Sequence, residues 1–256
     1  NDQFNRGADP VIYWSPDGTV PTEAGGMPLD IVEKYIRKDP EDIHQPKTAL
    51  ITYENADSDG QVRSLEYMKN VRALADKYHL PIHLDGARIF NAATVLGVEA
   101  KEIAQYADSV SVCLSKGLCA PVGSVLVGSK EFIAVARRKR KIIGGGMRQV
   151  GILAAAGKIA LNVMSKRLQE DHDNAKYMAE ALCGVKGLEV YKERQQINMV
   201  FFRLKDYPLS SAELVDYMAK HDVIINGEDN GIMRFATHKY VTREEIDKVV
   251  DLMKQV

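Results

Sequence analysis

The stretch "LPIHLDGARIFNAATVLG" (residues 80–97) combines an apolar strand with a helix that follows it directly. Its first part, residues 80–85, is a short apolar strand that ends at Asp85, and residues 87–97 have the spacing of an amphipathic helix. A strand that is followed directly by a helix is the repeating unit of parallel sheets, because the helix carries the chain back to the edge where the next strand begins. This stretch therefore predicts an α/β fold.

The same alternation continues on both sides of residues 80–97. Strands are predicted at 48–54, 108–115 and 123–129, and helices at 64–79, 129–141 and 149–164. The strand at 123–129 follows its predecessor too closely for a helical crossover, so it should run antiparallel. We expect a mostly parallel sheet that helices cover on both faces.

A second, smaller unit follows after about residue 170, where the composition shifts. Strands are expected at 197–204, 223–226 and 232–237, and helices at 211–221 and 243–255. Thr242 and Glu245 have the spacing of a capping box for the last helix. The chain is thus predicted to consist of a large domain at 1–165 and a small C-terminal α+β domain at 166–256.

Composition excludes several classes of function. The 256 residues carry a formal net charge of −1, which gives no reason to expect nucleic acid or an anionic membrane as a partner. No apolar run reaches the length of a membrane span. The cysteines Cys113, Cys119 and Cys183 are few and odd in number, which indicates free thiols and a reducing, cytoplasmic location. Cys113 and Cys119 lack a matching His/Cys pair, so no metal site is expected.

Charged side chains follow two of the predicted strands where those strands end. Asp85 ends one strand, Arg88 lies three residues later, and Lys116 follows the strand at 108–115. Ligands of open α/β sheets bind at the carboxyl ends of the strands. This set suits pyridoxal phosphate: the lysine amine forms a Schiff base with the aldehyde, the aspartate keeps the pyridine nitrogen protonated, and the arginine holds a carboxylate.

Each of these residues also has a simpler explanation. Asp85 could be the N-cap of the next helix, since aspartate is favoured there. Arg88 could form a surface ion pair, and Lys116 could be a solvated loop lysine. The residues alone leave both interpretations open.

Three longer motifs favour the cofactor interpretation. They are "HLDGARIFNAA" (83–93), "ADSVSVCLSKGLCAPVGSVLVGSKEF" (107–132) and "RKRKIIGGGMRQVGILAAAG" (138–157). In this order and spacing they resemble the low-specificity threonine aldolases, which are pyridoxal-phosphate enzymes of fold type I. The resemblance implies an aspartate-aminotransferase-like large domain, with a mostly parallel sheet, and a small C-terminal domain.

The resemblance also implies roles for individual residues. Lys116, in "LSKG", matches the lysine that binds the cofactor aldehyde, and Asp85, in "LDGAR", matches the partner of the pyridine nitrogen. Arg88 matches an arginine beside the cofactor and the substrate carboxylate. Arg234, in "MRFATH", matches the small-domain arginine that clamps this carboxylate.

Two further residues match positions near the substrate. Lys141, in "RKRKIIGGGMRQ", matches a basic residue near the substrate carboxylate, contributed across a subunit interface. His44, in "EDIHQPKT", matches a catalytic histidine near the substrate side chain, although a loop histidine that satisfies backbone groups is an equal alternative. The basic run at 137–141 is otherwise explained by the favourable position of cations at a helix C-terminus.

The implied activity is cleavage of L-threonine, L-allo-threonine and related β-hydroxy-α-amino acids to glycine and an aldehyde, in a homodimer or homotetramer. Two departures keep alternatives open. The family's N-terminal segment, with its phosphate-binding Gly-Thr turn and ring-stacking histidine, has no match here, and Ala56 stands where the family often has threonine. The alternatives are another fold type I lyase, an aminotransferase, or an inactive fragment.

Overall fold

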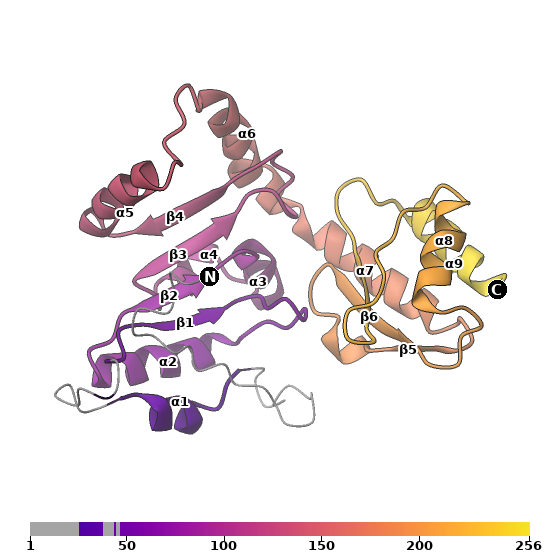
Figure 1. Ribbon diagram of the computed structural model, residues 1–256, viewed down its shortest axis with the longest axis horizontal. Coiled ribbons are helices and arrows are strands. Elements are labelled where there is room, and N and C mark those ends of the chain that lie inside the picture. The colour runs from indigo at the N-terminus through magenta and orange to yellow at the C-terminus, as the bar shows by residue number, and fades with distance from the viewer. Residues whose placement is uncertain (1–25, 38–43, 45–46) are drawn as a thin grey trace.

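Two β-sheets organise the part of the chain that the computed structural model describes, which comprises residues 26–37, 44 and 47–256. The large sheet has the strand order β1-β2-β3-β4 and the small sheet the order β5-β6-β7 (Figure 1). The large sheet contains β1 (Ile51–Glu54), β2 (Ile82–Asp85), β3 (Ser109–Cys113) and β4 (Ser124–Gly128), and the small sheet contains β5 (Leu188–Val190), β6 (Met199–Leu204) and β7 (Met233–Ala236).

The large sheet has the strand directions expected from the sequence. β1, β2 and β3 run parallel, and β4 returns antiparallel to β3. The crossovers are α2 (Leu65–Lys77) between β1 and β2, and α3 (Ile89–Leu96) with α4 (Ala100–Ala104) between β2 and β3. α2 begins after Ser64, whose side-chain oxygen accepts a hydrogen bond from the Tyr67 N–H. α3 ends at Gly97, which has a positive φ of 66°.

The apolar side chains of the large sheet gather on one face. Cross-strand partners share a face, and the register places Tyr53, Leu84 and Val110 in one such row. Leu84 and Val110 are buried with residues of α2, α3 and α4. The next row, Glu54, Asp85 and Ser111, lies on the opposite face. Coverage of both faces was expected, but within the described residues these helices cover only the apolar one, because polar side chains occupy alternate positions of the strands.

The strand β4 and the helix α5 that follows it are exposed. α5 (Lys130–Ile142) begins after Ser129 as predicted, α6 (Gly151–Asn162) follows, and a single 3₁₀ turn covers Met164–Lys166. None of the described side chains of α5 is buried, and all five residues of β4 are exposed. At the other end of the described chain, α1 (Leu29–Tyr35) packs on the outer side of α2 (Figure 1).

The small sheet is antiparallel and packs against three helices, α7 (Leu168–Leu182), α8 (Ser211–Ala219) and α9 (Arg243–Lys254). The capping box at Thr242 and Glu245 is confirmed. The strand predicted at 223–226 is wrong, because among the described residues this segment has no ladder partners and forms no regular secondary structure. α7 was not predicted, because its sequence is rich in polar residues.

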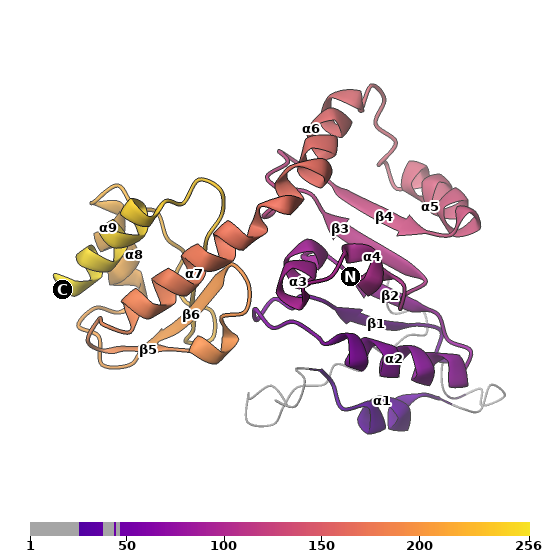
Figure 2. The same ribbon diagram turned by 180° about the vertical axis from the view of Figure 1, so that it is seen from behind.

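One hydrophobic cluster contains residues of both sheets, and α7 runs from one sheet toward the other in Figure 2. Ile197, Met199 and Phe201 lie at the start of β6 or just before it. They are buried in the same cluster as Leu84 and Val110 of the large sheet. The domain boundary between residues 165 and 166 therefore stays a prediction.

Candidate functional site

The row Glu54, Asp85 and Ser111 forms the floor of the candidate site, and we call it the polar row. Glu54 pairs with Asp85 across β1 and β2, and Asp85 pairs with Ser111 across β2 and β3. The first two residues end their strands, so the row lies at the carboxyl edge of the parallel part of the sheet. This is the edge at which open α/β sheets bind ligands.

Asp85 lies in the middle of the polar row and is held there by two hydrogen bonds. Its Oδ1 accepts from the Ala87 N–H at 3.0 Å and from the Ser111 hydroxyl at 3.5 Å. The N-cap of α3 is Arg88 rather than Asp85. The alternative that Asp85 is an ordinary helix cap is therefore wrong. Its carboxylate is exposed above the sheet, where a ligand could reach it.

Glu54 and Arg88 form an ion pair at the end of the row. The Arg88 guanidinium lies 3.4 Å from Glu54 Oε1, and its side chain is largely buried. Burial raises the pKa of Glu54, and the neighbouring charge of Asp85 raises it further, while Arg88 and Lys116 act in the opposite direction. Sequence reasoning missed Glu54, although its place as the last residue of the predicted strand 48–54 was an available signal.

Lys116 lies in a tight loop between β3 and β4. Leu114 and Leu118 are buried and anchor the two sides of the loop, while Lys116 between them is exposed. The Cys119 N–H donates to the Lys116 carbonyl at 2.8 Å and closes the turn. Lys116 is near enough to Glu54 for its charge to lower the pKa of that carboxyl. The structure thus brings Lys116, Arg88 and Asp85 to one edge of the sheet, as the sequence predicts.

Arg234 lies on β7, and the register of the small sheet shows which way it faces. Its cross-strand partner is Phe201 of β6, and such partners share a face. Phe201 is buried in the cluster that contains Leu84 and Val110 of the large sheet. Arg234 therefore stands on the face of the small sheet that is turned toward the large sheet.

The remaining two predicted site residues are not placed in the polar row. His44 lies in a turn between α1 and β1 and is exposed. Lys141 is the penultimate residue of α5 and is also exposed, and its side chain runs along Gly146. α5 follows the far end of β4, whereas the Lys116 loop precedes that strand. The roles of His44 and Lys141 stay predictions.

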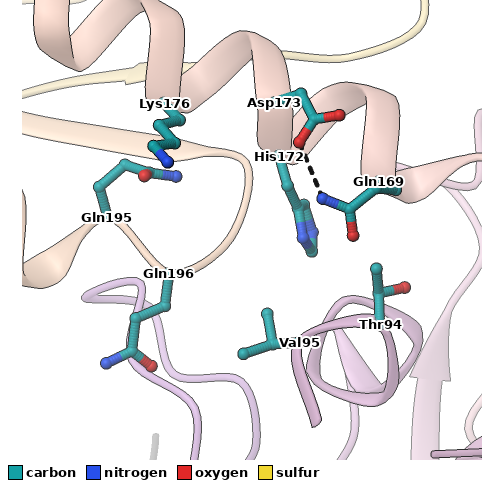
Figure 3. A pocket seen from close by; sticks show the side chains of 8 residues that line it. All are labelled: Thr94, Val95, Gln169, His172, Asp173, Lys176, Gln195 and Gln196. Carbon is teal, nitrogen blue, oxygen red and sulfur yellow. Dashed lines mark hydrogen bonds between the residues drawn. The ribbon is translucent and has the colours of Figure 1, made fainter. Parts of the chain in front are cut away.

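A separate polar pocket lies between α3 and α7, with a cavity volume of about 300 Å³. Figure 3 shows the imidazole of His172 projecting from α7 between Gln169 and Val95. The Gln169 amide donates to Asp173 Oδ1 at 2.8 Å (Figure 3). The residues that line this pocket include none of the predicted site residues that the structure describes.

The three cysteines are free thiols, as expected. Within the described ranges, no three His, Cys, Asp or Glu side chains come together as a metal site would require. No helix among the same residues is both long and apolar enough to cross a bilayer.

Comparison with known families agrees with the geometry of the strand ends. The sequence model of the beta-eliminating lyases matches residues 13–205, which is most of the chain. The chain belongs to the beta-eliminating lyase family.

Relatives of this chain include two proteins named as threonine aldolases. It is 48% identical over 225 residues to the low-specificity L-threonine aldolase of Escherichia coli K12, a match that covers 88% of the chain and 65% of the relative. It is 39% identical over 237 residues to the probable low-specificity L-threonine aldolase 2 of Arabidopsis thaliana, covering 91% of the chain and 67% of the relative. The predicted resemblance is thereby confirmed, and the chain spans about two thirds of the length of these relatives.

A solved structure supports the predicted fold class. The chain resembles a pyridoxal-phosphate-dependent aminotransferase from Streptococcus suis with a TM-score of 0.68. The likeness covers 91% of this chain and 61% of that protein, at 16% sequence identity. The prediction of an aspartate-aminotransferase-like fold, with a mostly parallel large sheet, is confirmed.

Proposed function

We propose that this chain is a pyridoxal-phosphate-dependent aldehyde-lyase of the threonine aldolase type. It would cleave L-threonine, L-allo-threonine and related β-hydroxy-α-amino acids to glycine and an aldehyde. The observation that carries the proposal is the convergence of Asp85, Arg88 and Lys116 at one sheet edge. The names and the degree of identity of the relatives add to it.

The chemistry of the side chains fits the cofactor. Lys116 would hold its aldehyde carbon through the side-chain amine, since the loop presents this amine to solvent rather than to the core. Asp85 would hold a proton on the pyridine nitrogen, because its carboxylate stands exposed on the floor of the site. Pyridoxal phosphate, when bound, supplies a protonated ring that withdraws electrons from the bond being broken.

The other charged residues would bind and orient the substrate. Arg88 and Arg234 would hold the carboxylate from two sides, one on the large sheet and one on the facing surface of the small sheet. The Glu54 carboxylate fixes Arg88 by the 3.4 Å contact. Orienting the carboxylate in this way fixes the direction of the Cα–Cβ bond, which lowers the entropic part of the barrier.

Cleavage moves two protons besides breaking the Cα–Cβ bond. The β-hydroxyl loses its proton and becomes the aldehyde carbonyl, and Cα gains a proton to give glycine. We propose His44 as a catalytic group near the β-hydroxyl and Lys141 as a further cation near the carboxylate, both from the resemblance of their motifs. A histidine suits proton transfer because its imidazole can both accept and donate a proton.

The first test is an absorbance titration of the full chain with pyridoxal phosphate, beside Lys116→Ala. We expect a visible absorption band of lysine-bound cofactor in the unmodified chain that Lys116→Ala lacks. We also expect glycine and acetaldehyde in equal amounts from L-threonine, with at least a hundredfold lower rate in the variant, on the order of what a positioned amine contributes. Lys186→Ala, a change on the surface of the small domain, serves as the matched control.

The same experiment separates the alternatives. A visible band without glycine would indicate another fold type I lyase or an aminotransferase, which release ammonia or transfer the amino group. The aminotransferase has a specific observation in its favour, the fold likeness to the Streptococcus suis protein. No band in the unmodified chain would favour an inactive fragment and contradict the proposal.

We further propose self-association as a homodimer or homotetramer through β4, α5 and α6. Large apolar side chains are strongly exposed there, including Ile142 at 76%, Ile143 at 77% and Ile152 at 83%. Contiguous exposed apolar side chains mark interaction surfaces. Lys141 lies beside two of them, which agrees with its expected role across a subunit interface. A monomer by light scattering at micromolar concentration would contradict this proposal.

We propose a cytoplasmic location. Its support is the free state of Cys113, Cys119 and Cys183, since a reducing compartment keeps thiols reduced.

A further inference from the structure

Asn91 is a buried polar residue that the proposed mechanism leaves unused. It lies in the first turn of α3, three residues after Arg88, and is 4% exposed. A buried amide without partners is costly, so each of its hydrogen bonds has a structural consequence.

The Asn91 amide donates two hydrogen bonds, both to residues outside the large sheet. Nδ2 lies 3.0 Å from His172 Nε2 on α7 and 3.3 Å from Asn198 Oδ1, directly before β6. Since Nδ2 can only donate, His172 must accept at Nε2 and is therefore neutral. Burial lowers the pKa of His172 to about 4, which agrees with this assignment.

Asn198 extends the connection to the strand that carries Arg234. Its Nδ2 donates to the Thr237 carbonyl at 2.7 Å, and its own carbonyl accepts from the Thr237 N–H at 3.0 Å. Thr237 is buried and directly follows β7, three residues after Arg234. A hydroxyl contact from Thr237 Oγ1 to the Asp171 carbonyl, at 2.6 Å, ties the same residue to α7.

In the other direction, Asn91 lies beside the loop of Lys116. A Cβ atom placed on Gly117 would lie 3.7 Å from Asn91 Oδ1 and 3.0 Å from the Cδ2 of Leu168. The backbone beside Lys116 therefore lies directly against the amide and against the start of α7. One side chain thus lies next to the Lys116 loop and is linked by two hydrogen-bonded steps to the end of the Arg234 strand.

We propose that Asn91 is a positioning residue, which fixes the strand of Arg234 relative to the loop of Lys116. The roles of Arg234 and Lys116 in substrate binding rest on the proposed function. The coupling between the two segments is a property of the fold and can be tested without the cofactor.

The first experiment measures hydrogen exchange by mass spectrometry in Asn91→Ala. We expect peptides that contain Gly117 and peptides that contain Thr237 to exchange at least about tenfold faster, since both lose a common support. Asn174→Ala is the matched control, because it removes an amide that donates to the Val241 carbonyl at 3.0 Å, outside this network. Unchanged exchange in either segment would overturn the proposal.

A second variant covers the possibility that Asn91→Ala folds poorly. Asn198→Ala removes the side chain that accepts from Asn91 and donates to the Thr237 carbonyl. We expect it to accelerate hydrogen exchange in the Thr237 peptides by a similar factor. Protection at the unmodified level in this variant would equally overturn the proposal.

The second experiment uses the chain loaded with pyridoxal phosphate. We expect Asn91→Ala to keep the visible absorption band and to raise KM for L-threonine about tenfold or more, with kcat changed less than about threefold. In an Arg234→Gln background the same change should alter KM less than about twofold, because the clamp is already lost.

Purely structural damage would lower the fraction of active enzyme and reduce kcat in both backgrounds, which would overturn the proposal. Absence of the visible band in the unmodified chain would count against the proposed function, while the hydrogen-exchange result would still decide the role of Asn91.

Discussion

β3 and β4 lie side by side in the large sheet and have nearly the same sequence, SVSVC and SVLVG, yet their side chains are in different surroundings. Val110 of β3 is 4% exposed, whereas its direct cross-strand partner Val127 is 49% exposed. β3 has a strand on each side and helices over its apolar face, and β4 forms the edge of the described sheet. Burial of a strand therefore depends on its neighbours and not on its own hydrophobicity alone.

The largest expected effect comes from placing a charge at each member of this pair. Val110→Asp buries an unpaired carboxylate in the core, so we expect it to lower the free energy of unfolding by at least about 4 kcal/mol. Val127→Asp remains hydrated, and we expect a change below about 1 kcal/mol. Urea unfolding followed by circular dichroism measures both.

Light scattering on the same two variants extends the comparison. Val127→Asp should weaken self-association, because it places charge within the exposed apolar surface. Equal destabilisation by the two variants would mean that β4 is as well covered as β3, and it would contradict the contrast drawn from their exposure.

A smaller effect on the free energy of unfolding is expected from pH, through the buried histidine His172. Burial lowers the pKa of His172 from its ordinary 6.5 to about 4, with Asp173 acting weakly in the opposite direction. Between pH 6.5 and about 4, His172 is therefore protonated in the unfolded chain and neutral in the folded chain. The free energy of unfolding thus falls as pH decreases through this range. The full loss corresponds to about 3 kcal/mol.

The His172→Gln variant isolates this contribution. Its unfolding free energy should depend less on pH between 7 and 4 than that of the unmodified chain, because glutamine does not titrate. If the free energy of unfolding changed with pH in parallel for the two proteins, His172 would be protonated equally in the folded and the unfolded state. Urea midpoints at half-unit pH intervals provide the measurement.

The smallest effects are expected at two helix caps of the same chemistry. Ser64 accepts from the Tyr67 N–H at 3.1 Å, and Ser129 from the Phe132 N–H at 3.2 Å. Ser64→Ala should lower global stability by about 1 kcal/mol, because α2 packs into the core through four buried residues. Ser129→Ala should instead accelerate hydrogen exchange within α5 and leave the global unfolding midpoint nearly unchanged. A lower global unfolding midpoint in both variants would show that α5 unfolds together with the core.

Much of the fold was predictable from local pattern. The strand that ends at Asp85, the antiparallel return at residues 124–128 and the caps at Ser129 and Thr242 all follow from periodicity, connection length and capping chemistry. α7 was not predictable in this way, because its buried face includes Asp171 and His172, which read as solvent-exposed in a sequence. The segment 223–226 has strand-like residues, but no strand pairs with it in the described chain.

Some residues of the candidate site could likewise be predicted from the sequence, and others could not. Asp85, Arg88 and Lys116 could be chosen from the sequence because each lies at or after the end of a predicted strand. Glu54 and Asn91 were missed. Glu54 gains its place from the register between β1 and β2, and Asn91 from contacts to residues 81 and 107 positions away along the chain.

Local sequence pattern was enough to predict the alternation of strands and helices, the edge of the sheet that carries the charged residues, and the family. These properties depend on neighbouring residues along the chain, whose spacing is written directly in the sequence. The burial of β3 and the exposure of β4 follow from tertiary packing, as do the position of Arg234 opposite Phe201 and the hydrogen bonds of Asn91 to His172 and Asn198. Each of these depends on contacts between distant segments, which local periodicity does not encode.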